Sequence, residues 1–173
     1  MARLVDQGRT RLTWVPGEDG IADITAPTVS ELTAPSAVDL TCMMVTTYEV
    51  RADGSDTTSE RAVCDVANVA TPTVANYMGR FDLFRQWDPE QDQWDTQNDP
   101  LAFLQYSEVG FFVRRTGLPH DQAYEEGQQV EVYRFMPDHA QINAGTGEGY
   151  LKMTVPLLQQ GAFELRAVVT SGS

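Results

Sequence analysis

The sequence has little of what catalysis and nucleic-acid binding usually require. Its 173 residues include two histidines and two cysteines, and only 12 lysines and arginines against 25 aspartates and glutamates. The net charge of −13 disfavours a sequence-specific DNA-binding protein, because such proteins use basic side chains to displace counterions from phosphates. Acidity also keeps proteins soluble. Composition alone does not show whether the negative charge serves to repel DNA or only to maintain solubility.

Long apolar segments are missing as well. The longest apolar run is far shorter than the roughly 18 residues of a transmembrane helix, and the first residues lack the apolar region of a secretory signal. We therefore expect no membrane association and synthesis in the cytoplasm. Cys42 and Cys64 lie 22 residues apart without a CxxC pair. In the cytoplasm this favours two free, buried thiols over a disulfide.

Recognisable catalytic and metal-binding motifs are also lacking. His120 and His139 stand in no known motif, and no Gly-x-Ser-x-Gly elbow is present. The glycines of residues 145–149 lack the Lys and the following helix of a phosphate-binding loop, which favours a turn. The acidic segment 86–99 is either a solvated loop or a site for a hard cation, but it lacks EF-hand spacing. We expect no enzyme and no catalytic, cofactor-binding or metal site, although a pair of carboxylates for glycoside hydrolysis leaves no sequence signature.

Alternating apolar and polar residues predict a mainly β protein. Residues 75–84 are the clearest case, with Tyr77, Phe81 and Leu83 on one face and a bulge or bend at Gly79. The last two predicted strands would form a hairpin around residues 159–161, each with one buried and one wet face. The predicted strands are 11–15, 37–45, 75–84, 110–115, 128–136, 149–158 and 162–170.

Two short helices and three irregular segments complete the prediction. Thr28 and Glu31 have the spacing of a capping box, and Asn98 or Asp99 would cap a helix over residues 101–106. We predict an N-terminal arm (1–10), an extended loop (49–61) that either is a surface loop or contacts a neighbouring subunit, and an acidic loop (86–99). Without an internal repeat or a linker, residues 1–173 form one domain.

Residues 5–16, residues 24–32 and the segment starting at Ala37 resemble, in order and composition, the tail tube (major tail) proteins of long-tailed bacteriophages. The actinobacteriophage, siphovirus-like members are the most similar. The resemblance is weaker but ordered at residues 75–84, 110–115 and 128–133. It implies an antiparallel β-sandwich or half-barrel with one flanking α-helix. It also implies a virion protein, made in the host cytoplasm, that needs no cofactor.

The resemblance implies self-assembly. Subunits would form hexameric rings that stack into the tube through which the genome reaches the host, with DNA passing without specific binding. The tape measure, tail terminator and distal tail proteins would be further partners. Deleting residues 1–10 would then leave the fold intact but impair ring stacking. Candidates for a polar face towards the lumen or a neighbouring subunit are Asn76, Arg80, Asp82, Glu131, Lys152, Glu164 and Arg166. Candidates for inter-ring contacts are Val5, Asp6, Gln7, Arg51, Asp53, Asp56 and Arg61.

Two alternatives remain open at this point. One is a tube protein of a secretion system or contractile particle, which genome neighbours would distinguish. The other is an unrelated all-β binding domain.

Overall fold

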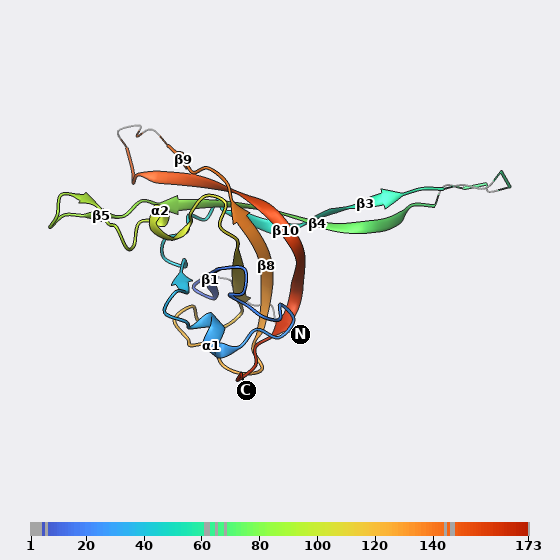
Figure 1. Ribbon diagram of the computed structural model, residues 1–173, viewed down its shortest axis with the longest axis horizontal. Helices are drawn as coiled ribbons and strands as arrows, with labels where there is room; N and C mark the ends of the chain where they lie inside the picture. Colours follow the sequence, from blue (N-terminus) through green and yellow to red (C-terminus); the bar gives the residue numbers. More distant parts are fainter. Residues whose placement is uncertain are drawn as a thin grey trace.

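Antiparallel strands make up most of the ordered structure (Figure 1). The chain is seen in a computed structural model that describes residues 5, 7–60, 63–64, 66–67, 69–143, 145 and 148–172. In this part of the chain the helices are single turns, α1 (Val29–Leu32) and α2 (Pro100–Phe103). The strands are β1 (Thr10–Pro16), β2 (Val38–Asp39), β3 (Glu49–Thr58), β4 (Thr71–Phe84), β5 (Trp87–Asp88), β6 (Gln93–Trp94), β7 (Gly110–Thr116), β8 (Gln129–Pro137), β9 (Gln141–Ile142) and β10 (Lys152–Val168).

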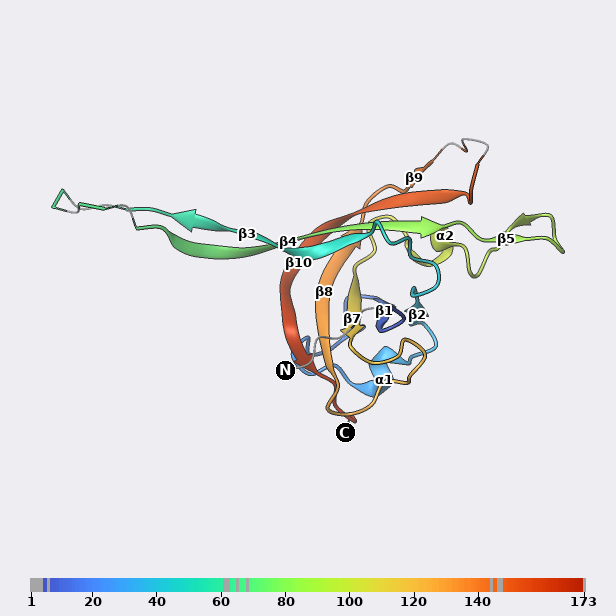
Figure 2. The same ribbon diagram turned by 180° about the vertical axis from the view of Figure 1, so that it is seen from behind.

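One sheet of eight strands forms the body of the protein. Its order is β2-β1-β7-β8-β10-β4-β3, with β9 paired to the start of β10. Three strands separate β1 from β4, yet Trp14 of β1 meets Phe81 of β4 edge to face, with 6.1 Å between ring centroids. The sheet therefore curls back on itself, as Figure 2 shows from behind. This arrangement confirms the predicted mainly antiparallel half-barrel.

The concave face of the curled sheet encloses an aromatic core. Phe81 and Phe112 are fully buried there, with 5.1 Å between their ring centroids. The predicted alternation along β4 is confirmed, because Tyr77, Phe81 and Leu83 all enter this core. Its other buried members are Leu12, Trp14, Leu40, Met44, Val50, Leu104, Tyr133, Phe135, Met153, Val155 and Leu157.

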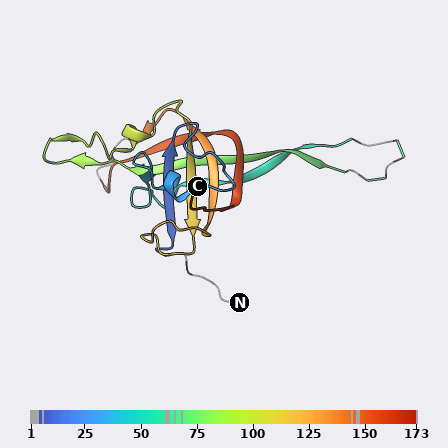
Figure 3. The same cartoon turned by 60° about the horizontal axis from the view of Figure 1, so that its bottom comes forward.

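The opposite face of β1, β7 and β8 is buried too, beneath α1 and the loop that carries Tyr124. Along β7, Phe112 enters the inner core whereas Phe111 and Val113 enter the outer one. A strand buried on both faces reads as an unbroken apolar run, which explains the sequence Gly-Phe-Phe-Val. Seen from below, β1, β7, β8 and β10 lie side by side around the body (Figure 3).

Both helices begin at the predicted caps. The Thr28 hydroxyl accepts a hydrogen bond from the Glu31 backbone N–H (3.2 Å), and the Glu31 carboxylate accepts one from the Thr28 N–H (2.7 Å), which confirms the capping box. Asp99 caps α2. This helix ends at Phe103, so it is shorter than the predicted 101–106.

The end of the chain differs from the prediction. Residues 159–161 do not reverse direction, and β10 is a single strand of 17 residues. Gly161 has a φ of +90°, and the register against β8 shifts between Gln159 and Phe163 and again between Glu164 and Ala167. The glycine therefore marks a bulge in a bent strand. Residues before this bulge pair mainly with β4, and residues after it pair with β8.

Three other predicted segments also differ. The extended loop 49–61 is mostly strand β3, whose pairing with β4 runs from Glu49↔Arg80 to Thr58↔Thr71. The acidic loop 86–99 contains the small hairpin β5–β6. Of residues 37–45 only Val38–Asp39 form a strand, because residues 41–43 turn beneath the buried Leu40 and Met44. Residues 37–45 were predicted as one mostly buried strand, but the four-residue spacing of the buried Leu40 and Met44 belongs to a turn.

Two local predictions need correction for steric and hydrogen-bonding reasons. The pairing shows no shift at Gly79. A Cβ at this position would lie 2.5 Å from Phe135 Cζ, so the glycine permits close packing and is not a bulge.

The predicted arm 1–10 is shorter, since the Gly8 carbonyl accepts a hydrogen bond from the His120 N–H (3.0 Å) and the Arg9 carbonyl accepts one from the Gly117 N–H (2.8 Å). Residues 8–10 thus belong to the body.

Candidate assembly surfaces

The β3–β4 hairpin projects from the body as a two-stranded ribbon (Figure 1). At its root, Val50 and Tyr77 enter the inner core. Beyond this pair, the side chains of residues 51–60 and 71–75 are all exposed. An isolated two-stranded ribbon is marginally stable at best in water. The outer part of this hairpin therefore depends on its root or on contact with another molecule.

Tyr77 fixes that root. Its hydroxyl donates a hydrogen bond to the Arg134 carbonyl and accepts one from the Gln160 backbone N–H (3.0 Å). Its ring packs against Phe135 and Phe163, at centroid distances of 5.0 and 5.2 Å. Burial raises the pKa of Tyr77 and keeps the hydroxyl protonated as a donor. This one side chain contacts both β8 and β10 and so helps to hold the ribbon against them.

The far end of the hairpin, which we call the tip, is apolar. Its exposed aliphatic side chains are Val63, Val66, Val69 and Val74. Cys64 also lies in the tip. Both Cys64 and Cys42 are free and exposed, so the prediction of free thiols is confirmed and the prediction that they are buried is wrong. Of the predicted inter-ring residues, Arg51, Asp53 and Asp56 are exposed on β3, and Val5 and Gln7 are exposed near the N-terminus. Asp6 and Arg61 lie outside the described residues.

At the opposite end of the molecule lies a pocket of about 490 Å³, which we call the aromatic pocket. The rings of Trp87 and Trp94 meet edge to face across β5–β6, with centroids 5.2 Å apart, and Tyr150 packs likewise on Phe84 at 5.7 Å. Trp87, Trp94, Tyr150 and Leu151 are exposed there, although aromatic side chains are usually covered. Among the described residues, the lining consists of Cys42, Phe84, Arg85, Gln86, Trp87, Trp94, Gly149, Tyr150 and Leu151.

A buried ion pair holds this pocket in place. Arg85 Nε and Asp99 Oδ2 are 2.6 Å apart, and each side chain is only 4% exposed. Asp99 also caps α2 and accepts a hydrogen bond from the Gln86 N–H (3.2 Å). The Arg85 guanidinium lies 3.8 Å from the centroid of the Trp94 ring, within the range of a cation–π interaction. The sequence indicated the cap but not its arginine partner, which lies 14 residues away.

The structure brings four of the predicted polar-face residues together. The pairing of β4 with β10 places Arg80, Asp82 and Lys152 on the face turned away from the inner core, and Asn76 continues this face along the hairpin. Asp82 accepts hydrogen bonds from the Thr47 and Thr154 hydroxyls, each 2.8 Å long, and lies 3.3 Å from Arg80. We call these four residues the polar face.

The other three predicted residues do not join it. Glu131 lies on the same face of β8 as Tyr133, where it forms an ion pair with Arg114 of β7 and accepts a hydrogen bond from the Tyr133 hydroxyl (3.0 Å). Glu164 lies beyond the bulge of β10, opposite Val132, and accepts from the Arg166 N–H (2.8 Å). Alternation suggested one face, but the bulge and the sheet's curl separate these positions.

Arg115 is a structural residue that the sequence analysis missed. Its side chain is 1% exposed and donates hydrogen bonds to the carbonyls of Pro119 (2.7 Å) and Ala123 (3.0 Å) and to the side chain of Gln128 (3.0 Å). Burial lowers the pKa of this guanidinium. The side chain fixes residues 117–128 against β7. Its only sequence signal is a charged residue within an apolar strand.

Carboxylates of the acidic segment 86–99 accept hydrogen bonds from residues of the segment's own turns. Asp95 accepts hydrogen bonds from the side chain and backbone of Asn98 and from the Gln97 N–H, which together lower its pKa. Asp88 accepts from the N–H groups of Glu90 and Gln91. Within the described residues, no three His, Cys, Asp or Glu side chains are grouped as metal ligands. Nor does that part of the chain contain a helix long and apolar enough to cross a membrane.

A family model described as phage tail tube protein matches residues 1–172. The chain belongs to this family. It is therefore a structural component of a phage virion tail, and its family is not one of enzymes. No curated protein matches the chain. Membership excludes the alternative of an unrelated all-β domain, and it gives the exposed hairpin and the aromatic pocket their context as surfaces of a subunit that builds a tube.

Proposed function

We propose that six copies of this chain close into a ring and that such rings stack into the tail tube, the conduit that delivers the phage genome into the host. The exposed β3–β4 hairpin carries this proposal. The outer side chains of this ribbon are exposed, and their contacts within the subunit lie along the ribbon itself, as in the hydrogen bond from Asn76 Nδ2 to Asp56 Oδ1 (3.1 Å). We therefore expect the ribbon to contact another copy. We therefore assign Arg51, Asp53 and Asp56 to contacts between rings, together with Val5 and Gln7.

Ring closure also accounts for the edges of the sheet. The eight-stranded sheet ends in β2 on one side and in β3 on the other. Exposed strand edges promote uncontrolled pairing, and a closed ring of subunits covers them. A closed ring also needs one surface patch to match a different one on the neighbour, which two unlike edges supply.

We assign the polar face to the wall of the lumen. Its arginine is partnered by an acid, with Arg80 Nη2 3.3 Å from Asp82 Oδ2. Basic groups already paired with carboxylates release few counterions from DNA, so the genome would slide without specific binding. Glu164 and Arg166 are assigned to contacts between neighbouring subunits.

At its ends and in its lumen such a tube needs other proteins. We propose the tape measure protein inside the growing tube, the tail terminator at one end and the distal tail protein at the other. The match to the tail tube family supports these proposals, because a tube has two ends and an enclosed lumen.

Electron microscopy of the purified protein tests the function directly. Rings and tubes that lengthen with protein concentration are the expected result. Monomers at every concentration and salt condition would contradict it. A density map of the tube tests the lumen separately, because a wall lined by unpaired lysines and arginines is incompatible with the assignment of the polar face.

A further inference from the structure

We propose that the tip of the β3–β4 hairpin docks into the aromatic pocket of a neighbouring copy. The inference rests on the proposed function, since it names the surface that receives the hairpin when subunits stack. It places two native thiols close together across each contact, Cys64 of one copy and Cys42 of the next.

The two surfaces match in chemistry. The tip offers Val63, Val66 and Val69, all exposed and aliphatic. The pocket offers tryptophan, tyrosine and leucine side chains, with Trp87 50% and Tyr150 82% exposed. Its volume of about 490 Å³ lies in the range of pockets that enclose small apolar ligands. Burying both surfaces together removes the two exposed apolar regions from water.

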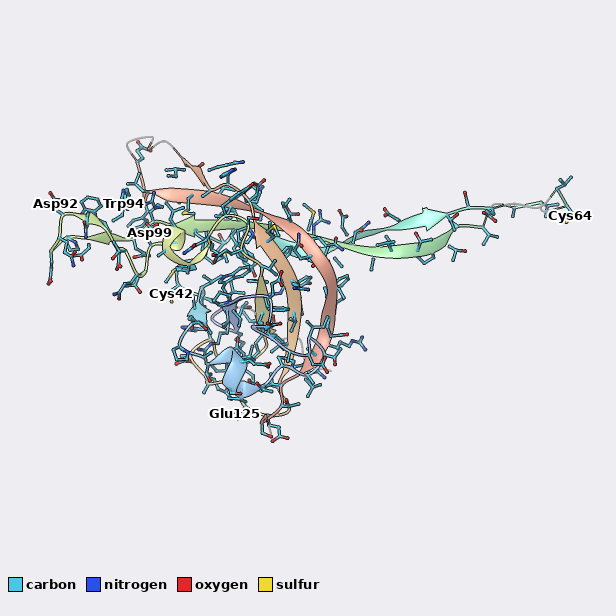
Figure 4. The ribbon with its side chains drawn as sticks, viewed as in Figure 1. Cys42, Cys64, Asp92, Trp94, Asp99 and Glu125 are labelled. Carbon is cyan, nitrogen blue, oxygen red and sulfur yellow. The ribbon has the colours of Figure 1, made fainter. Side chains whose placement is uncertain are left out.

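The geometry requires the contact to be between copies. Figure 4 shows Cys64 at one far end of the molecule and Trp94 and Asp92 at the other, with Cys42 on the pocket side of the body. The ten residues of β3 alone span about 33 Å at the usual rise per residue. A chain therefore cannot fill its own pocket. A contact between two different surfaces is heterologous, and such contacts propagate into rings or open stacks.

The two contact surfaces themselves carry few charges. None of the described residues that line the pocket carries a carboxylate. The sequence from Val63 to Ala75 carries a single charged residue, Asp65, which lies outside the described residues. Acidic side chains flank both surfaces, with Asp53, Asp56 and Glu60 on the hairpin and Asp88, Glu90, Asp92 and Asp95 beside the pocket. We therefore expect salt to strengthen docking, because it screens repulsion between these flanks while leaving the apolar contact intact.

Thiol cross-linking tests the inference on the full-length chain. Assembled protein is treated with a short bismaleimide, and the products are separated under denaturing conditions. Because each chain carries one Cys42 and one Cys64, the proposed contact gives a ladder of dimers, trimers and longer covalent chains. Contact between identical thiols gives dimers only and would overturn the inference.

Single-cysteine variants provide the matched controls. Cys42→Ser retains only the tip thiol and Cys64→Ser retains only the pocket thiol, so neither is expected to cross-link alone. A mixture of the two is expected to yield dimers. Cross-linking within either variant alone would contradict the proposed pairing.

Substitutions on each surface locate the contact more closely. Val66→Asp should weaken stacking by at least about tenfold, the usual effect of losing one buried aliphatic side chain, while Val66→Thr retains the shape and should lose less. Tyr150→Ala should reduce the cross-linked ladder, and Tyr106→Ala, an exposed tyrosine outside the pocket, should not. Cross-linking unchanged in Tyr150→Ala would overturn the assignment, since Cys42 also borders a second pocket lined by Tyr48 and His120.

The outcomes separate the two proposals. Normal tubes without a cross-linked ladder overturn this inference and leave the proposed function standing. Protein that never assembles contradicts both.

Discussion

The inner and outer halves of β4 belong to one strand but differ in what they bury. In the inner half, Tyr77, Phe81 and Leu83 are at most 4% exposed, and the rings of Tyr77 and Phe81 pack against aromatic side chains of β1, β7, β8 and β10. In the outer half, residues 71–75 are exposed on both faces. The inner half gains its stability from burial within the subunit. The outer half has no such contacts until another molecule supplies them.

This difference separates folding from assembly. Burial in the inner half stabilises the monomer, whereas exposure in the outer half leaves apolar surface available to a neighbouring copy. Changes in the two halves should therefore have different consequences, and the following experiments are arranged from the largest expected effect to the smallest.

Removing the outer hairpin should abolish stacking without unfolding the body. In this variant residues 54–75 are replaced by Asn-Gly, which joins the paired residues Asp53 and Asn76 through a two-residue turn. We expect no tubes by electron microscopy and a cooperative thermal unfolding transition like that of the parent chain. Loss of that transition would show that the hairpin stabilises the monomer and would remove the distinction between the halves.

Substitution in the inner half should destabilise the monomer strongly. Phe81→Ala removes a fully buried ring that contacts Trp14 and Phe112, and such truncations cost about 3–5 kcal/mol in the free energy of unfolding. The matched control is Val74→Ala in the outer half, for which we expect a change below about 0.5 kcal/mol. Urea denaturation measures both. Equal losses at the two positions would contradict the comparison.

At the boundary of the halves, Tyr77→Phe should have an intermediate and pH-dependent effect. It removes two hydrogen bonds at the root and should cost about 1–2 kcal/mol at neutral pH. Burial raises the pKa of Tyr77 above its usual value of 10.0, so its contribution is complete below about pH 10 and is lost as the pH rises through the folded-state pKa.

Unfolding curves measured at increasing alkaline pH test that sign. The free energy of unfolding of the parent chain should fall above pH 10, and that of Tyr77→Phe should fall less steeply. Identical slopes would show that Tyr77 ionises equally easily in both states, against the burial argument. The remaining slope is expected from Tyr124 and Tyr133, whose pKa values burial also raises.

The smallest effect is expected at the N-terminus. Deleting residues 1–7 spares the hydrogen bonds of Gly8 and Arg9 and should change the free energy of unfolding by less than about 0.5 kcal/mol. Deletion through residue 10 also removes the Thr10↔Thr116 pair of β1 and should cost more. If residues 1–7 contribute to stacking, the shorter deletion shortens tubes in micrographs. Tubes of normal length would restrict the inter-ring contacts to the hairpin.

Local patterns predicted the elements whose partners lie nearby in the sequence. Thr28 and Glu31 predicted their capping box because both groups lie within one helical turn. Alternation predicted which face of β4 is buried, because the faces of a strand repeat every two residues. The same reasoning failed at Gly161, where a glycine between two alternating runs is compatible with either a turn or a bulge. The choice depends on which strand lies alongside.

The candidate surfaces were predicted less well than the fold. Residues 49–61 were predicted as a loop because β3 is polar on both faces, and strands are usually recognised by one apolar face. Backbone hydrogen bonds to β4 determine the pairing of these residues, and no pattern of side chains in the sequence indicates such bonds. The aromatic pocket combines Cys42, Phe84, Trp94 and Tyr150, and segments so far apart meet only through the topology of the sheet.

By itself, the sequence determined the all-β class, the buried face of the inner strands, the helix caps and the membership of the tail tube family. The fold class, the buried face and the caps follow from composition and from periodicities over a few residues, which local sterics and hydrogen bonding impose. The family membership follows from the match of the family model to residues 1–172. Only the tertiary structure decided that β10 bends without reversing, that Glu131 lies apart from Asp82, and that an apolar tip and an aromatic pocket lie at opposite ends of the molecule. Those outcomes depend on strand register and sheet curvature, which arise from contacts between residues far apart in the chain.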